Sequence, residues 1–177
     1  MPDRVSFQWE TLETILSEPN IKELLVAYWR DGYDWREAEA EYLKRLSPFA
    51  KITIRELREE SFGEKSNPEI IKEKEAEKII IELNKIKNKF IIALDGTGKQ
   101  FSSIDFSKQI NNPTLQQYNN LIFIIGGPLG LHDSIIKLTN LKLSLSKMTF
   151  THQMIHIFLL EQLYRANMIM TNRKYHY

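Results

Sequence analysis

The chain has 177 residues, no cysteine, and 24 basic against 23 acidic side chains, so its formal net charge at pH 7 is +1. The lack of cysteine excludes disulfides, zinc sites built on thiolates and cysteine nucleophiles. Without a long basic tract, any nucleic-acid binding must use a local patch or a second subunit. The first ten residues lack the apolar core of a signal peptide, and no apolar run reaches membrane-spanning length. We therefore expect a soluble, cytoplasmic protein with no membrane partner.

The first 46 residues are predicted to be helical. Apolar side chains recur at helical spacing from Trp9 to Leu16, and Ile21 to Trp29 continues this pattern. Asp34, with Glu37 three residues later, predicts a capping box for a helix that ends at Leu46. We expect the three tryptophans of this part to pack in the core.

From residue 50 onward, strands and helices alternate. The alternating apolar side chains of Ala50 to Leu57 predict a half-buried strand. Asn67 caps a helix that has Pro68 in its first turn. Lys89 to Leu94 predicts a buried strand, and Ser103 to Ile110 a short helix. Such alternation indicates an α/β fold with a parallel sheet.

The segment after residue 120 contains two strand ends, each followed by a loop and a helix. Leu121 to Ile125 is a continuous apolar run bounded by the glycine pair that begins at Gly126, which is typical of a strand buried on both faces. A helix over His132 to Leu138 and a strand over Leu141 to Leu145 follow, and a long apolar helix begins after Thr151. Because ligands bind at the carboxyl edge of a parallel sheet, both loops should face one ligand.

Several segments, in this order along the chain, resemble the ribosomal RNA large-subunit methyltransferase H family, a minimal group of SPOUT-class methyltransferases. The resemblance extends from about Glu39 to Tyr177. It is carried by AEYLKRLSPF, KEKEAEKI, IALDGTGKQFSS, FIIGGPLGLH, LSLSKMTFTHQM, LLEQLYRA and the terminal YHY. The fold that it implies is an α/β, SPOUT-type, Rossmann-like parallel sheet whose C-terminal part forms a trefoil knot.

The resemblance also implies a cofactor, a substrate and an oligomeric state. The cofactor would be S-adenosyl-L-methionine and the reaction methylation of a pseudouridine at N3, in large-subunit ribosomal RNA of the assembled ribosome. The enzyme would be a homodimer without a metal ion. The cofactor positions carried over from the family are Leu94, Gly126, Leu145, Ser146, Lys147, Met148, Thr149 and Phe150.

Three residues are candidates for a catalytic role. His152 and His176 are candidate bases for the N3 proton, because N3–H is a weak acid. Arg165 is a candidate phosphate ligand, although it lies four residues after Glu161 and a structural ion pair explains it equally well. Helix capping or packing is the alternative for His152.

The sequence departs from the family pattern at both ends and beside the predicted site. No strand and glycine turn of the family type is recognisable before residue 39, and YWRDGYDWREAEA is instead similar to the N-terminal segment of epoxide hydrolases. The prediction is an atypical helical segment, residues 1–40, before a methyltransferase domain, residues 41–177, that lacks its first strand. Thr151, His156 and Tyr177 stand where the family usually has proline, arginine and a basic residue.

Three other interpretations remain open. The segment GGPLG after a strand suggests a dinucleotide-binding oxidoreductase, but the glycine pattern is incomplete. His152 and His156 have metal-ligand spacing, yet Gln153 occupies the place of the glutamate in H-E-x-x-H. The non-enzymatic alternative is a methyltransferase-like domain that binds cofactor or RNA without turnover.

The apolar helix from Met154 to Met170 indicates a core or a subunit contact.

Overall fold

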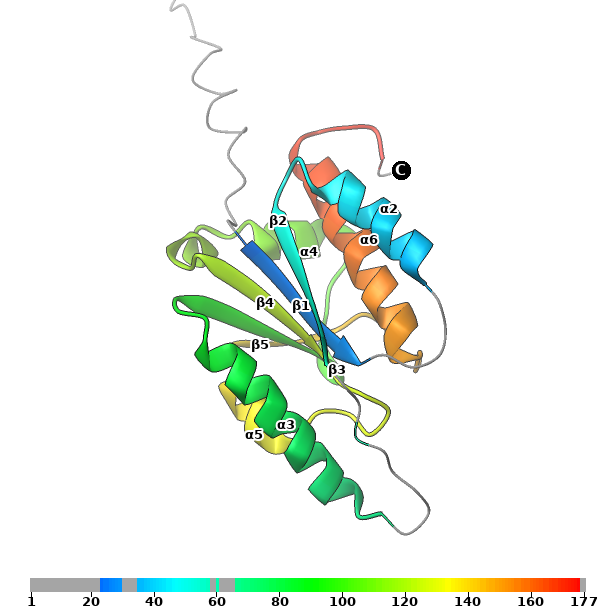
Figure 1. The fold of residues 1–177 in the computed structure, drawn as a ribbon. Coiled ribbons are helices and arrows are strands. Elements are labelled where there is room, and N and C mark those ends of the chain that lie inside the picture. The colour runs from blue at the N-terminus through cyan, green and yellow to red at the C-terminus, as the bar shows by residue number, and fades with distance from the viewer. Residues whose placement is uncertain (1–22, 30–34, 58–59, 61–65, 176–177) are drawn as a thin grey trace, which may run out of the picture.

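Five strands in the order β2-β1-β4-β3-β5 form the central sheet of the molecule (Figure 1). The computed structural model describes residues 23–29, 35–57, 60 and 66–175. The strands are β1 (Glu23–Trp29), β2 (Lys51–Leu57), β3 (Lys89–Gln100), β4 (Asn120–Ile125) and β5 (Leu141–Ser144). All four strand pairings are parallel, which confirms the predicted parallel α/β sheet.

Helices cover both faces of this sheet, as expected for parallel strands joined by crossover connections (Figure 1). One face carries α2 (Arg36–Leu46), α4 (Ser103–Ile110) and α6 (His152–Met170). The other face carries α3 (Pro68–Asn84) and α5 (Asp133–Leu138). A short 3₁₀ helix, η1 (Pro113–Gln117), precedes β4.

Strand β4 shows how the sequence builds the core. Leu121, Phe123 and Ile125 pack in the cluster under α2, α4 and α6, whereas Ile122 and Ile124 pack in the cluster under α3 and α5. Successive side chains of a strand point to opposite faces, so a continuous apolar run fills both clusters. The prediction of a strand buried on both faces is confirmed.

The helix predicted over Ile21 to Trp29 is wrong. Glu23–Trp29 forms β1, which pairs in parallel with β2 on one side and with β4 on the other. The run ELLVAYW is short and apolar, and periodicity alone does not separate a strand from a helix in such a run. The strand thought to be missing is therefore present in the sheet. The predicted division at residue 40 rests on the same expectation, and it assigns β1 to a different part from both of its neighbours.

The helix starts were predicted correctly for α3, whereas α2 begins at a residue that was not predicted as its cap. The Oδ1 atom of Asn67 accepts a hydrogen bond from the amide of Glu69 at 2.9 Å, which confirms the predicted cap of α3. The N-cap of α2 is Trp35, which makes no side-chain capping bond and is 42% exposed, so the prediction that it packs in the core is wrong. Asp34 and the helix predicted over Trp9 to Leu16 lie outside the described residues.

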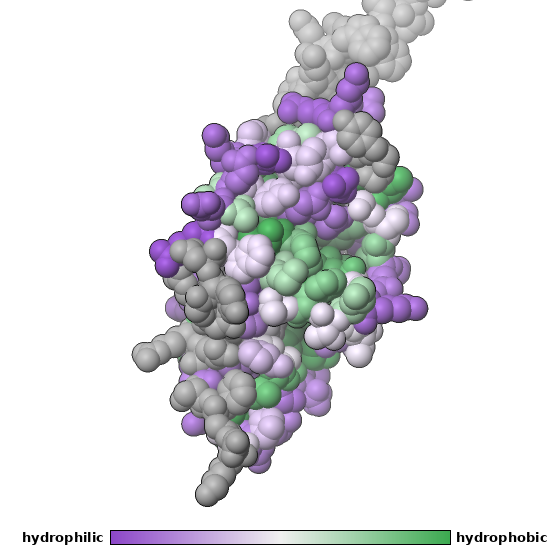
Figure 2. All heavy atoms as spheres, turned by 90° about the vertical axis from the view of Figure 1, so that its right-hand side faces the viewer, coloured by the Kyte–Doolittle hydropathy of each residue, from purple (hydrophilic) through white to green (hydrophobic). Residues whose placement is uncertain are grey.

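The molecular surface has an apolar area on the side of the molecule that carries α2 and α6. Figure 2 views this side and shows apolar side chains gathered across its middle, with polar side chains around them. Phe158 on α6 and Met148 in the loop before it are both exposed. Of the helices that the structure describes, none combines the length and apolar composition of a bilayer-crossing segment.

Candidate functional site

A cavity of about 450 Å³ lies at the carboxyl ends of β4 and β5, beside the middle of β3. Its walls come from Leu94 to Gly96 within β3, from the loop between β4 and α5, and from the loop between β5 and α6. The prediction that both polar loops lie on one edge of the sheet and face one cavity is confirmed. The volume lies in the range of pockets that hold small molecules or cofactors.

All eight residues predicted to contact the cofactor line this cavity. They are Leu94, Gly126, Leu145, Ser146, Lys147, Met148, Thr149 and Phe150. The first and the last of them, Leu94 and Phe150, are 56 positions apart along the chain. The sheet brings the two segments together because β3 and β5 are neighbours. Their contact with a cofactor stays a prediction.

The glycines of the β4–α5 loop allow its main chain to fold back closely. A Cβ atom added at Gly126 would lie 3.0 Å from the carbonyl carbon of Gly130 and 3.1 Å from the Leu131 side chain. The amide of Gly130 donates to the carbonyl oxygen of Gly127 at 2.9 Å, and Gly130 has a φ of +78°. A side chain at Gly126 would therefore displace the opposite side of the same loop, which also lines the cavity.

The β5–α6 loop is shaped by hydrogen bonds from its own hydroxyl groups. Ser144 Oγ donates to the carbonyl oxygen of Ser146 at 2.8 Å, and Ser146 Oγ accepts from the amide of Met148 at 2.9 Å. Thr151 is the N-cap of α6, and its Oγ1 accepts from the amide of Met154. These bonds hold the loop in place before any ligand binds.

Asp95 is a lining residue that the sequence analysis did not select. Its Oδ1 atom accepts hydrogen bonds from Thr97, from the amide at 2.7 Å and from Oγ1 at 2.5 Å. The hydrogen bond from the Thr97 hydroxyl, helped by the charge of Lys142, lowers the pKa of the carboxyl below its usual value. The signal that could have found it is its place directly after the apolar run that ends at Leu94, where the sequence predicted the end of a parallel strand, although β3 continues to Gln100.

The structure separates the two histidines at the start of α6. His152 is buried and lines the cavity. His156 is 2% exposed and is not a lining residue; its Nε2 atom lies 3.5 Å from Oε2 of Glu39 on α2. Burial lowers the pKa of His156 to about 4, so it is neutral at pH 7. His156 is therefore adjacent along α6 to Ile155, which lines the cavity, but its own side chain is buried and does not contribute to the cavity wall.

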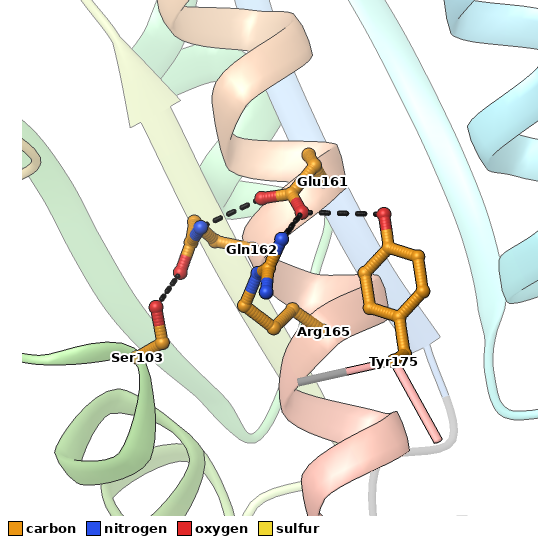
Figure 3. Close-up of polar contacts among 5 residues, drawn as sticks. All are labelled: Ser103, Glu161, Gln162, Arg165 and Tyr175. Atoms are coloured by element: carbon orange, nitrogen blue, oxygen red, sulfur yellow. Dashed lines mark hydrogen bonds and ion pairs between the residues drawn. The ribbon is translucent and has the colours of Figure 1, made fainter. Parts of the chain in front are cut away.

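Arg165 lies in a cluster of side chains on α6 rather than in the cavity (Figure 3). Its Nε and Nη2 atoms donate to Oε1 of Glu161 at 3.0 and 2.7 Å. The hydroxyl of Tyr175 donates to the same oxygen at 3.3 Å, and the Arg165 guanidinium lies 4.9 Å from the Tyr175 ring centroid. The pKa of Tyr175 is raised to about 12, and burial of the side chain is the largest cause of this shift. Arg165 thus forms the ion pair with Glu161 that their spacing predicted, while its proposed contact with a phosphate stays a prediction.

The same cluster continues toward α4. Gln162 Nε2 donates to Oε2 of Glu161 at 2.6 Å, and Ser103 Oγ donates to Oε1 of Gln162 at 2.8 Å (Figure 3). These three residues line a second cavity of about 300 Å³, which shares the wall Leu143–Ser146 with the first. We call the five residues Ser103, Glu161, Gln162, Arg165 and Tyr175 the α6 cluster.

Two further residues that the sequence singled out lie at the C-terminus. His176 and Tyr177 lie outside the described residues. Within the described part of the chain, no group of three or more histidine, aspartate or glutamate side chains is arranged to hold a metal ion.

Comparison with known proteins gives a consistent result over most of the chain. A family model described as a predicted SPOUT methyltransferase matches residues 21–176. This match begins just before β1, so it includes the strand that the sequence analysis missed.

Curated relatives that are similar to this chain carry the name ribosomal RNA large subunit methyltransferase H. The protein of Natranaerobius thermophilus is 46% identical over 143 residues, which are 77% of this chain and 87% of the relative. The protein of Clostridium acetobutylicum is 41% identical over 161 residues, 89% of this chain and 99% of the relative. The protein of Halothermothrix orenii is 43% identical over 139 residues, which are 77% of this chain and 86% of the relative.

Proposed function

The chain belongs to the SPOUT methyltransferase family, and on this premise we propose that it transfers a methyl group from S-adenosyl-L-methionine to large-subunit ribosomal RNA. The names of its relatives support ribosomal RNA of the large subunit as the substrate. We extend the proposal to N3 of a pseudouridine in the assembled ribosome, as the resemblance of the sequence motifs implies.

The observation that carries this proposal is the cavity at the strand ends. Its volume of about 450 Å³ suits a nucleoside cofactor, and its walls combine apolar side chains with the close main-chain turn at Gly126. Leu94, Gly126 and the loop Leu145–Phe150 would hold the cofactor, with Leu94 as an apolar wall for its adenine. When bound, the cofactor supplies a methyl sulfonium, which is already a strong electrophile.

The protein's own contribution would then be alignment and proton removal. His152 is the better placed of the two candidate bases, because it lines the cavity. His176 stays a prediction. For Arg165 we now favour a structural role, because its guanidinium is held by Glu161 and Tyr175.

We further propose that the protein is a homodimer and that it works in the cytoplasm. In each chain, the C-terminal part would form a trefoil knot. The apolar side chains on the α2 and α6 side of the molecule support the dimer (Figure 2). Met148 is 73% exposed although it lies on the rim of the cavity, which suits a site completed by a second subunit.

The alternative of an inactive, binding-only domain has lost two of its three supports. The first strand is present as β1, and His156 is buried instead of facing the cavity. Only Tyr177 remains, and it lies outside the described residues.

Methyl transfer tests the proposal directly. Labelled S-adenosyl-L-methionine and ribosomes that lack the pseudouridine methyl group should yield label in large-subunit RNA. The variant Gly126→Trp should incorporate none, whereas Ile81→Trp, which places the same side chain at an exposed position of α3, should match the unaltered chain. Cofactor binding without incorporation by the unaltered chain would favour the inactive alternative.

A further inference from the structure

Asp95 lies at the point where β3 leaves its regular pairing with β5. The pairing of the two strands shifts register between Leu94 and Lys99, so the residues between them are released from the ladder. Asp95 and Gly96 belong to this irregular part of β3, and both of them line the cavity. The Asp95 side chain is half-buried.

The carboxylate of Asp95 is fixed in one orientation with one oxygen committed. Both hydrogen bonds from Thr97 end on Oδ1, at 2.7 and 2.5 Å. In the described residues, the hydrogen bonds of Asp95 leave Oδ2 available as an acceptor. A carboxylate that is held in place in this way loses little conformational freedom when it binds a donor.

The residues that line the cavity include one carboxylate and one ammonium group. Asp95 is its lining carboxylate, and Lys147, on the β5–α6 loop, supplies an exposed ammonium group. The side chains of Leu94, Ile125, Leu143 and Ile155 make other parts of the wall apolar. An apolar wall suits a purine ring, whereas a carboxylate and an ammonium suit the two opposite charges of an amino-acid group.

We propose that Asp95 binds the α-ammonium group in the methionine part of the cofactor. The inference rests on the proposed function, because it assumes that this cavity holds S-adenosyl-L-methionine. Asp95 would then decide which ligands the cavity prefers: adenosine derivatives that carry an amino-acid group over those without one. Lys147, as the opposite charge, would lie near the carboxylate of the same group.

Calorimetric titration of three ligands tests this assignment. S-adenosyl-L-methionine and S-adenosylhomocysteine both carry the ammonium group, and 5′-methylthioadenosine lacks it. Asp95→Asn should weaken the first two by roughly tenfold or more, since a charge-assisted hydrogen bond is lost. The affinity for 5′-methylthioadenosine should change less than about twofold, because its contacts are unaltered.

Two controls keep the result interpretable. Glu73→Gln removes one negative charge from an exposed position of α3 and should leave all three affinities unchanged. The thermal unfolding midpoint of Asp95→Asn should stay close to that of the unaltered chain, because the amide oxygen of asparagine can also accept the two hydrogen bonds from Thr97.

The outcomes separate the inference from the proposed function. Equal weakening of all three ligands would overturn the inference, because the contact would then be with the ribose or the adenine. Unchanged affinities for all three would also overturn it. If the unaltered chain binds neither S-adenosyl-L-methionine nor S-adenosylhomocysteine, the proposed function itself fails.

Discussion

The cavity is bordered by short loops and by close main-chain approaches at glycines, whereas α6 is held in its surroundings by pairs of side chains. Gly126 allows the β4–α5 loop to fold back beside the cavity, and Gly98 allows β3 to approach β5 closely. On α6, Glu161 and Arg165 are joined through charged side-chain atoms, and His156 faces Glu39. Figure 3 shows how the side chains of the α6 cluster converge from α4, α6 and the residues after α6.

This difference determines how each region should respond to substitution. A close main-chain approach at a glycine has no side chain to shorten, but it is sensitive to any added atoms. A side-chain cluster tolerates changes in size but loses individual hydrogen bonds and ion pairs in small steps. The four predictions below test this contrast, from the largest expected effect to the smallest.

Gly126→Trp should abolish cofactor binding, with a loss of affinity of more than about 100-fold. Even a Cβ atom at this position would lie 3.0 Å from the carbonyl carbon of Gly130, so an indole must displace the loop. Calorimetric titration with S-adenosyl-L-methionine measures the effect. Retention of tight binding by a folded variant would show that the main-chain wall is more adaptable than we describe.

His156 should make the stability of the protein depend on pH in a defined window. Its pKa is about 4 in the folded protein and 6.5 in the unfolded chain, so between these values only the unfolded state binds the proton. The free energy of unfolding should therefore fall as the pH drops from 6.5 to 4, by up to about 3 kcal/mol. His156→Leu should lack this contribution.

Urea unfolding at pH 7 and at pH 4.5 measures this contribution as the difference between the two proteins. The carboxylates titrate in both proteins, so their contributions to the pH dependence largely cancel in this difference. The same pH dependence in the two proteins would contradict a neutral, buried His156.

Gly98→Ala should lower the free energy of unfolding by about 2 kcal/mol, within the range for overpacked sites. The added Cβ atom would lie 2.7 Å from the carbonyl carbons of Lys142 and Leu143, so β3 and β5 must separate. Gly96→Ala is the matched control, since a Cβ atom there meets nothing within 4 Å. Equal stabilities of these two variants in denaturant unfolding would contradict the close approach of the strands.

Tyr175→Phe should have the smallest effect, a loss of about 1 kcal/mol in the free energy of unfolding. It removes only the hydroxyl that donates to Glu161 and leaves the ring over Arg165. In a double-mutant cycle with Glu161→Gln, the two losses should be less than additive. Strict additivity would mean that the hydroxyl and the carboxylate do not interact in solution.

Much of the fold followed from local patterns. The apolar run Leu121 to Ile125 and the alternation in β2 predicted strands correctly, because strand burial imposes a period of two or a continuous apolar run. Asn67 with Pro68 located the start of α3 through local hydrogen bonding alone. The missed element was β1, whose apolar residues fit a helix equally well until β2 and β4 provide hydrogen-bond partners.

The candidate site was predicted in part for the same reasons. The glycines and the polar loop after β5 mark main-chain turns, so their place on the cavity followed from the sequence. Asp95 was missed because a single acid after an apolar run is common in any protein, and only the neighbouring loops form the cavity that it lines. The burial of His156 did not follow from the sequence, because helical spacing does not say which side of α6 packs against α2.

The sequence by itself determined the parallel sheet, the strand-end loops and the family, because these depend on apolar periodicity, turn residues and motifs that are local in the chain. The tertiary structure alone decided that β1 fills the gap between β2 and β4, that Asp95 and Lys147 line one cavity, and that Arg165 binds Glu161 and Tyr175. The physical reason is that pairing, burial and charge neighbours are relations between distant segments. The residues that enter them acquire a role only when the sheet has brought those segments together.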